Sequence, residues 1–271
     1  MNHHVKQGWH LTMKHFYIII MLFLYELLWG FFLYRSVEGI MVPLLKRYPD
    51  SAPSDGAVAL FLTEAQFQLL KTDLIRPYIW LFASLLLGRM LLTPFLNAGL
   101  FHSLHHAQDE NGTRFIKGIR TAWKPIALLY GIETALTLAP GVWLLPKALD
   151  ALLSSGSLAD IANKIGPWAG GWLVWAALLH LLFLAMQFGV VSGNGALRSF
   201  WGGVRHLIPL AGISLLMWAI GMALSLTMAS ASMLWAGLIA LILHQSYHLV
   251  RTVMKVWTVA SQYEVWHSKQ T

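Results

Sequence analysis

Hydrophobic residues fall in runs of about twenty along most of this chain, separated by short polar segments. Since an α-helix rises ~1.5 Å per residue, a run of about twenty residues crosses a ~30 Å hydrocarbon core. The pattern predicts an all-α polytopic membrane helix bundle with six transmembrane helices, and residues 1–271 form a single membrane domain. The expected spans are residues 16–34, 77–102, 125–145, 168–191, 207–230 and 233–255.

The polar segments between these runs predict the remaining parts of the chain. Residues 1–15 are short and basic, and the apolar run after them is too long for a signal peptide, which indicates an uncleaved first span. An outer loop at residues 36–76 is the one large element expected outside the membrane. The C-terminal tail, residues 261–271, is amphipathic at best. In the fifth span, Gly221 and Ser225 predict close packing against another helix.

Composition agrees with the pattern, since 57% of residues are hydrophobic and 11% are charged. With no cysteine, the chain has no disulfide, thiolate metal site or cysteine nucleophile. If the N-terminus is cytoplasmic, the net charge of +7 falls almost entirely on the inner segments, whereas the outer segments balance. The positive-inside rule then predicts both termini inside, and it explains the basic balance by topology and anionic lipid rather than by nucleic acid.

Arg89 lies near the middle of the second expected span, with Thr93 and Asn97 at i+4 and i+8 on the same helix face. An arginine at the bilayer centre costs about 2.5–3.5 kcal/mol on insertion scales, so it should face protein or a water-filled cavity. We expect Arg89 to contact Glu133 first and Glu26 second.

Five ionisable residues from five expected spans lie at similar depth, each about ten to twelve residues into its span. Such residues often mark a substrate or proton path, although they can also only pin the bundle together. The expected polar intramembrane cluster consists of Glu26, Arg89, Thr93, Asn97, Glu133, His180, Gln187 and His244.

Histidine placement leaves two further alternatives. His180 and His244 lie at matching depth, as axial ligands of a haem would, but no companion haem motif is present, and we expect no cofactor. A set of inner histidines could bind a divalent metal, yet no carboxylate joins them at a ligand spacing, and we expect no metal site. This set is His102, His105, His106, His206 and His248. No catalytic residue is predicted.

Two inner connectors resemble each other, FIKGIRTAWKP from Phe115 and FWGGVRHLIP from Phe200. Both read F-x-x-G-[IV]-R with a proline four or five residues later, which favours a parallel repeat of spans two and three as spans four and five. We expect Arg120 and Arg205, the arginines of the two motifs, to contact lipid phosphate at the inner surface.

The two F-x-x-G-x-R turns and the span layout resemble bacterial, Firmicutes-type six-span membrane proteins of unknown function related to the glycerophosphodiester phosphodiesterase membrane-domain group. The resemblance covers about residues 77–260. It implies a fold and a place in the bacterial cytoplasmic membrane. The soluble phosphodiesterase domain of some relatives is absent from this sequence, so the resemblance implies no such activity.

The leading interpretation is a small transporter, permease subunit or channel-like protein whose path passes the polar cluster. The alternative is a non-catalytic membrane scaffold or assembly partner, in which the loop at residues 36–76 contacts another protein. An intramembrane enzyme ranks third, and no G-x-S-x-G, H-E-x-x-H or Walker-type phosphate loop is present. The expected partners are the lipid bilayer, with anionic lipid at the inner surface, and a protein at that loop.

Overall fold

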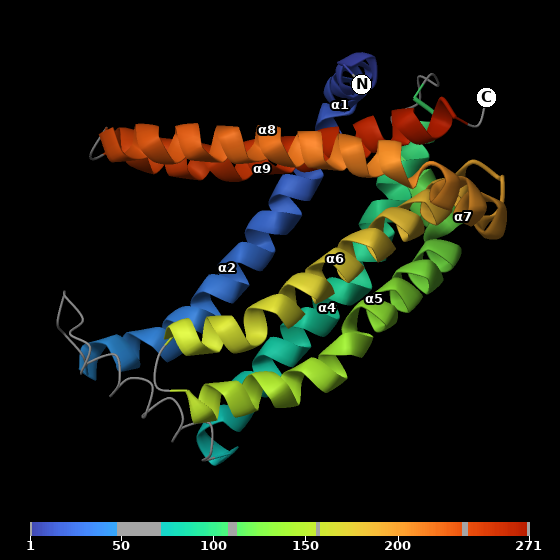
Figure 1. Ribbon diagram of the computed structural model, residues 1–271. Coiled ribbons are helices and arrows are strands. Elements are labelled where there is room, and N and C mark those ends of the chain that lie inside the picture. Colours follow the sequence, from blue (N-terminus) through green and yellow to red (C-terminus); the bar gives the residue numbers. More distant parts are fainter. Residues whose placement is uncertain (1, 48–71, 108–112, 156–157, 235–237, 270–271) are drawn as a thin grey trace. The chain divides into compact units, whose positions relative to one another are not determined.

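The computed structural model describes residues 2–47, 72–107, 113–155, 158–234 and 238–269, and the described part is helical (Figure 1). The helices are longer than the expected spans because helical hydrogen bonds are internal and can continue past the apolar run. Their bounds are α1 Asn2–Lys14, α2 Phe16–Arg47, α4 Thr72–His105, α5 Arg114–Ser154, α6 Leu158–Val191, α7 Ala196–Arg205, α8 Leu207–Leu234 and α9 Leu238–His267.

Among the described residues, five helical stretches are long and apolar enough to cross a membrane, as in a multi-pass membrane protein. They are Phe16–Glu38, Ile79–His105, Arg114–Leu152, Ala159–Val191 and Leu207–Ala231. Each of them overlaps one of the first five expected spans. The sixth, residues 233–255, lies partly outside the described residues and stays a prediction, as does the inner position of both termini. Of the expected outer loop, residues 48–71 lie outside the described residues, and the rest belongs to α2 and α4.

The chain divides into two compact units, and the division falls within long helices. The first unit contains Met1–Leu28, Thr93–Gly131 and His180–Thr271, and the second contains Trp29–Leu92 and Ile132–Leu179. Each unit therefore combines parts of several helices that are distant in the sequence.

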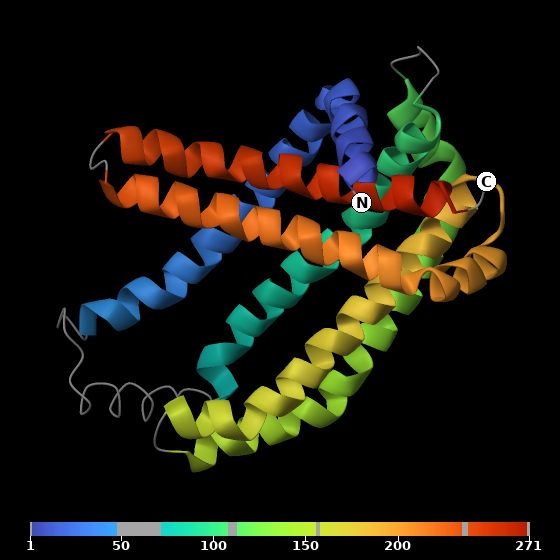
Figure 2. The same cartoon turned by 45° about the horizontal axis from the view of Figure 1, so that its top comes forward.

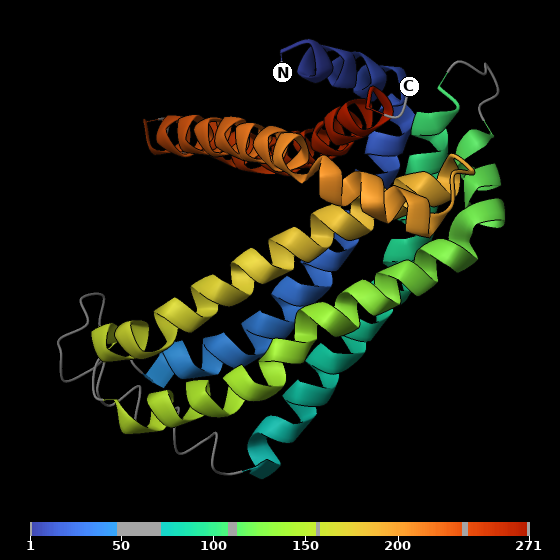
Figure 3. The ribbon, with the colours of Figure 1, turned by 45° about the vertical axis from the view of Figure 1, so that its right-hand side comes forward.

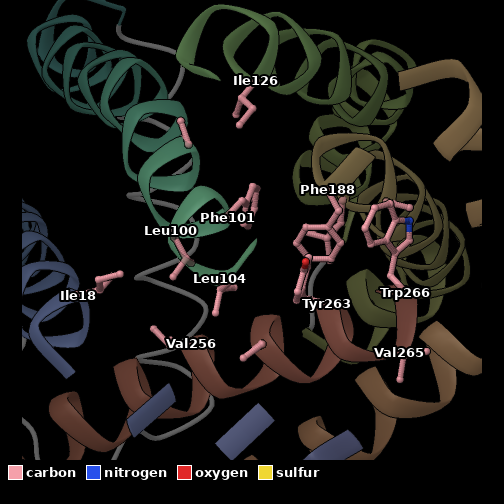
Figure 4. Close-up of a cluster of buried hydrophobic side chains, with 14 of the residues drawn as sticks. Ile18, Leu100, Phe101, Leu104, Ile126, Phe188, Val256, Tyr263, Val265 and Trp266 are labelled. Atoms are coloured by element: carbon pink, nitrogen blue, oxygen red, sulfur yellow. The ribbon is translucent and has the colours of Figure 1, made fainter. Parts of the chain in front are cut away.

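The first unit has a hydrophobic core to which α2, α4, α5, α6, α8 and α9 all contribute (Figure 4). Phe188 of α6 packs against three aromatic rings of this core, with its ring centroid 5.1 Å from that of Phe101, 5.3 Å from that of Tyr263 and 5.8 Å from that of Trp266. Tyr263 and Trp266 belong to the tail that was expected to be amphipathic at best. The end of α9 is instead a core element of this unit.

Helices α8 and α9 lie side by side as an antiparallel hairpin (Figures 1 and 2). The close packing expected at Gly221 and Ser225 faces α9. A side-chain carbon at Gly221 would lie 3.9 Å from the Met254 methyl group, and the Ser225 hydroxyl lies 3.1 Å from the Tyr247 hydroxyl.

Helix α1 packs across α9, so the basic N-terminal segment is part of the fold (Figures 2 and 3). Gly8 permits the close approach, because a side-chain carbon there would lie only 2.8 Å from the backbone nitrogen of Ser261. The Trp257 indole N–H donates a hydrogen bond of 2.9 Å to the Val5 carbonyl oxygen. Helices α1 and α9 are therefore fixed to each other.

In the second unit, α6 donates hydrogen bonds to two carbonyl oxygens of α5, and one of these lacks its helical partner because of a proline. Pro140 has no N–H, so the carbonyl of Leu136, four residues earlier, lacks its helical partner. The Trp175 indole N–H donates to that oxygen at 3.2 Å, and the Trp172 indole N–H donates to the neighbouring Thr137 oxygen at 2.6 Å. Two tryptophans thereby join α6 to the bend-prone part of α5.

Candidate functional site

The candidate site is a charged contact between α2 and α9 in the first unit, which we call the Glu26 site and define as Glu26, Thr252 and Lys255. The Lys255 ammonium lies 2.7 Å from Oε1 of Glu26. The Thr252 hydroxyl lies 3.2 Å from Oε2 of Glu26 and 3.0 Å from its own helix carbonyl at His248. Its single proton can serve one acceptor at a time, so Lys255 is the stronger partner.

The depth and the burial of this site determine its chemistry. Glu26 lies ten residues after the first residue of its candidate span, Phe16, or about 15 Å along the helix. Its side chain is 24% exposed, whereas that of Lys255 is 54% exposed. The carboxylate is therefore held within the helices while the ammonium reaches the surface of the chain.

A second polar contact next to Glu26 joins α2 to α4. The Tyr25 hydroxyl lies 3.2 Å from the Thr93 hydroxyl oxygen. Asn97, one turn after Thr93, is half-buried on the same helix. The structure thus places Thr93 beside the residue preceding Glu26.

The other members of the expected cluster are spread over both units. Glu133 is buried and belongs to the second unit, as does the exposed Arg89, whereas Gln187 is buried and His180 is exposed in the first unit. The contacts expected from Arg89 to Glu133 and to Glu26 stay predictions. His244 is a residue of α9 whose side chain lies outside the described residues, so its pairing with His180 stays untested.

Several of the inner histidines gather at the end of α4. The ring of His106 lies 4.2 Å from that of His102 and 4.8 Å from that of His105, measured between centroids. His105 Nδ1 is hydrogen-bonded to the Tyr263 hydroxyl at 2.8 Å, and its ring lies 6.5 Å from that of His267. Within the described ranges, no group of three or more histidine or carboxylate side chains could hold a metal ion. The cluster therefore packs the end of α4 against the end of α9.

The two F-x-x-G-x-R motifs have the same packing role. Gly118 lies against α4, where a side-chain carbon would be 2.9 Å from the Ala98 oxygen, and Gly203 lies against α6, where it would be 2.9 Å from the Ala185 methyl carbon. In each motif the glycine fits against the helix that precedes it. Arg120 and Arg205 are both exposed, and their contact with lipid phosphate stays a prediction.

Sequence reasoning missed the partners of Glu26. Lys255 lies at the end of the sixth expected span, and no sequence pattern pairs it or Thr252 with Glu26. The spacing of Thr252 and Lys255, three residues apart, does place both on one face of a helix. This spacing identifies the two residues as partners of Glu26 only once Glu26 is known to face α9.

No family model, curated protein or solved structure matches the chain.

Proposed function

We propose that this chain is a small membrane transport protein, meaning a transporter, a permease subunit or a channel-like protein. On its transport path, the Glu26 site transiently binds a proton or a small cation. The observation that supports the proposal is the unequal exposure of the pair: a carboxylate held between two helices is bound by an ammonium that is 54% exposed. A charged residue in a membrane-spanning segment is a functional candidate by default.

A lysine is well suited to an ion pair that has to break and re-form. Its ammonium is a point charge on a flexible four-carbon stem, so it can release the carboxylate without movement of either helix. A proton or cation arriving at Glu26 would then compete with Lys255 for the same oxygen. The Thr252 hydroxyl, 3.2 Å from the second oxygen, would continue to orient the carboxylate.

The test uses purified protein in sealed vesicles that contain a pH-sensitive dye, with proton, sodium or potassium gradients imposed in turn. The wild-type chain should carry a flux above that of protein-free vesicles, and Glu26→Gln should abolish it. Glu38→Gln is the matched control, because it removes a carboxylate of the same helix whose partner, Arg35, lies on that helix at 3.7 Å. Absence of flux in the wild type, or equal flux in both variants, would contradict the proposal.

A second candidate function, a membrane scaffold in which the pair only ties α2 to α9, is favoured by the contacts of both carboxylate oxygens. The charge-swapped chain, Glu26→Lys with Lys255→Glu, separates the two. If the pair only joins the two helices, the charge-swapped chain should be as stable as the wild type and should restore any growth phenotype. If the pair is a transport site, the charge-swapped chain should be inactive in transport, because the carboxylate then lies on α9 instead of α2.

A further inference from the structure

Helix α7 exposes one continuous apolar stripe. Leu197 and Trp201 are 79% and 72% exposed, and Val204 is 42% exposed. Ile208, the second residue of α8, is 84% exposed just beyond the end of this helix. Leu197, Trp201 and Val204 occur at i, i+4 and i+7, which is the spacing of a single helix face.

The opposite face of α7 is fixed to α6 by small residues. Ser199 is fully buried and packs on Gly189, which has no room for a side chain, and Gly203 packs on Ala185 one turn later. The turn between the two helices contains Gly193 and Gly195, with φ of 78° and 80°, a conformation that other residues rarely adopt. The exposed stripe is therefore held outward by packing on its other side.

The basic residues beside the stripe, and the exposed apolar residues that follow it on α8, indicate what covers the stripe. Arg198 and Arg205 are exposed and, at ~100° per residue, both lie on the same flank about a quarter-turn from the stripe. Directly after α7, exposed apolar side chains continue along the candidate span of α8, including Leu215 and Trp218. A helix with an apolar face, a tryptophan and a basic flank is typical of the membrane interface.

We propose that α7 is an in-plane anchor in the bilayer interface: its stripe of Leu197, Trp201 and Val204 lies at the acyl boundary, and Arg198 and Arg205 bind the phosphates of anionic lipid. A second protein copy is a poorer occupant. A ten-residue helix is ~15 Å long and ~10 Å wide, so its face covers about 150 Å², far below the ~800 Å² per partner of a stable interface. The anchor is independent of the proposed transport function.

The lack of cysteine makes the test direct, because each single-cysteine variant can carry a nitroxide spin label at one position. In vesicles of phosphatidylcholine and phosphatidylglycerol, labels at Leu197, Trp201 and Val204 should be reached by oxygen, which concentrates in lipid. A label at Arg198 should be reached by a water-soluble nickel chelate, and one at Trp218 serves as the lipid-facing reference. Equal chelate access at the stripe and at Arg198, or spin–spin broadening between two copies, would overturn the proposal.

A second experiment tests the lipid charge. The amount of spin-labelled phosphatidylglycerol held at the protein, relative to spin-labelled phosphatidylcholine, should fall about fivefold for each arginine removed in Arg198→Gln and Arg205→Gln. Arg251→Gln, which removes an exposed cation from α9, is the matched control and should leave the ratio unchanged. A ratio that is the same in the wild type and the double variant would overturn the assignment of anionic lipid.

Discussion

Removal of Lys255 should destabilise the protein more than removal of the Glu26 charge, although both break the same ion pair. Lys255→Met leaves a carboxylate that is only 24% exposed, with the Thr252 hydroxyl as its remaining partner. Glu26→Gln leaves an ammonium that is 54% exposed on a flexible stem and can turn away from the helices. A charge left without its partner costs more when it is less exposed.

The distance gives the scale of the effect. Two unit charges 2.7 Å apart attract by about 6 kcal/mol at an effective dielectric constant of 20 and by about 1.5 kcal/mol in bulk water. The exposure of Lys255 favours the lower figure, and the entropy of holding the side chains reduces it further, so we expect a coupling of about 1 kcal/mol. Lys255→Met should cost about 1–2 kcal/mol and Glu26→Gln about half of that.

The assay is a double-mutant cycle of Glu26→Gln and Lys255→Met, with unfolding of the detergent-solubilised protein followed by circular dichroism as the denaturing detergent increases. The coupling should weaken as salt is raised, because a partly exposed pair is screened. A coupling of zero within error would refute the reasoning about the pair. A larger loss for Glu26→Gln than for Lys255→Met would refute the reasoning about exposure.

Three further predictions concern packing and pH. Gly8→Val should detach α1 from α9, since any side chain at Gly8 meets the α9 backbone, and it should speed proteolysis within the first fifteen residues relative to Gly30→Val, where no atom lies within 4 Å. Trp175→Phe should cost about 1 kcal/mol in detergent unfolding, because the Leu136 carbonyl loses its donor; no loss would show that this bond contributes nothing. Burial raises the pKa of Glu264 above 4.5, so the folded chain holds that proton more tightly than the unfolded one. Its contribution to stability is full below pH 4.5 and is lost as pH rises through the raised pKa, so Glu264→Gln should flatten this slope; an unchanged slope would contradict the assignment.

Element positions could be predicted where the apolar runs are long. The five candidate spans overlap expected ones because crossing a membrane requires a minimum apolar length that is visible in the sequence. The ends of the helices were less predictable, since α2 continues from the expected limit at Tyr34 to Arg47. The prediction for the tail differed from the structure because polar residues just before Tyr263 also become buried, as Gln262 does through its hydrogen bond of 2.8 Å to Ser214.

The candidate site was predictable only in part. Glu26 could be selected because a carboxylate is rare within an apolar run. Its partner could not, because Lys255 lies 229 positions later in the chain and contacts it only where α9 meets α2. Charge counting by side assigns a lysine to the inner surface whether it is paired or not, so it cannot detect a partner of this kind.

The repeated F-x-x-G-x-R motif shows how one short sequence can be used in two ways. Gly118 and Gly203 both let their helix approach the preceding one, which is the feature that the two copies share. The copies differ in the backbone after the arginine: the helix that begins at Arg114 continues through the first motif, whereas the second copy ends at Arg205 and a new helix begins at Leu207. This break ends α7 before the candidate span of α8 begins, as the proposed anchor requires. An interface anchor is therefore expected at the second copy. Removal of Arg205 should lower the preference of the protein for phosphatidylglycerol over phosphatidylcholine more than removal of Arg120 does.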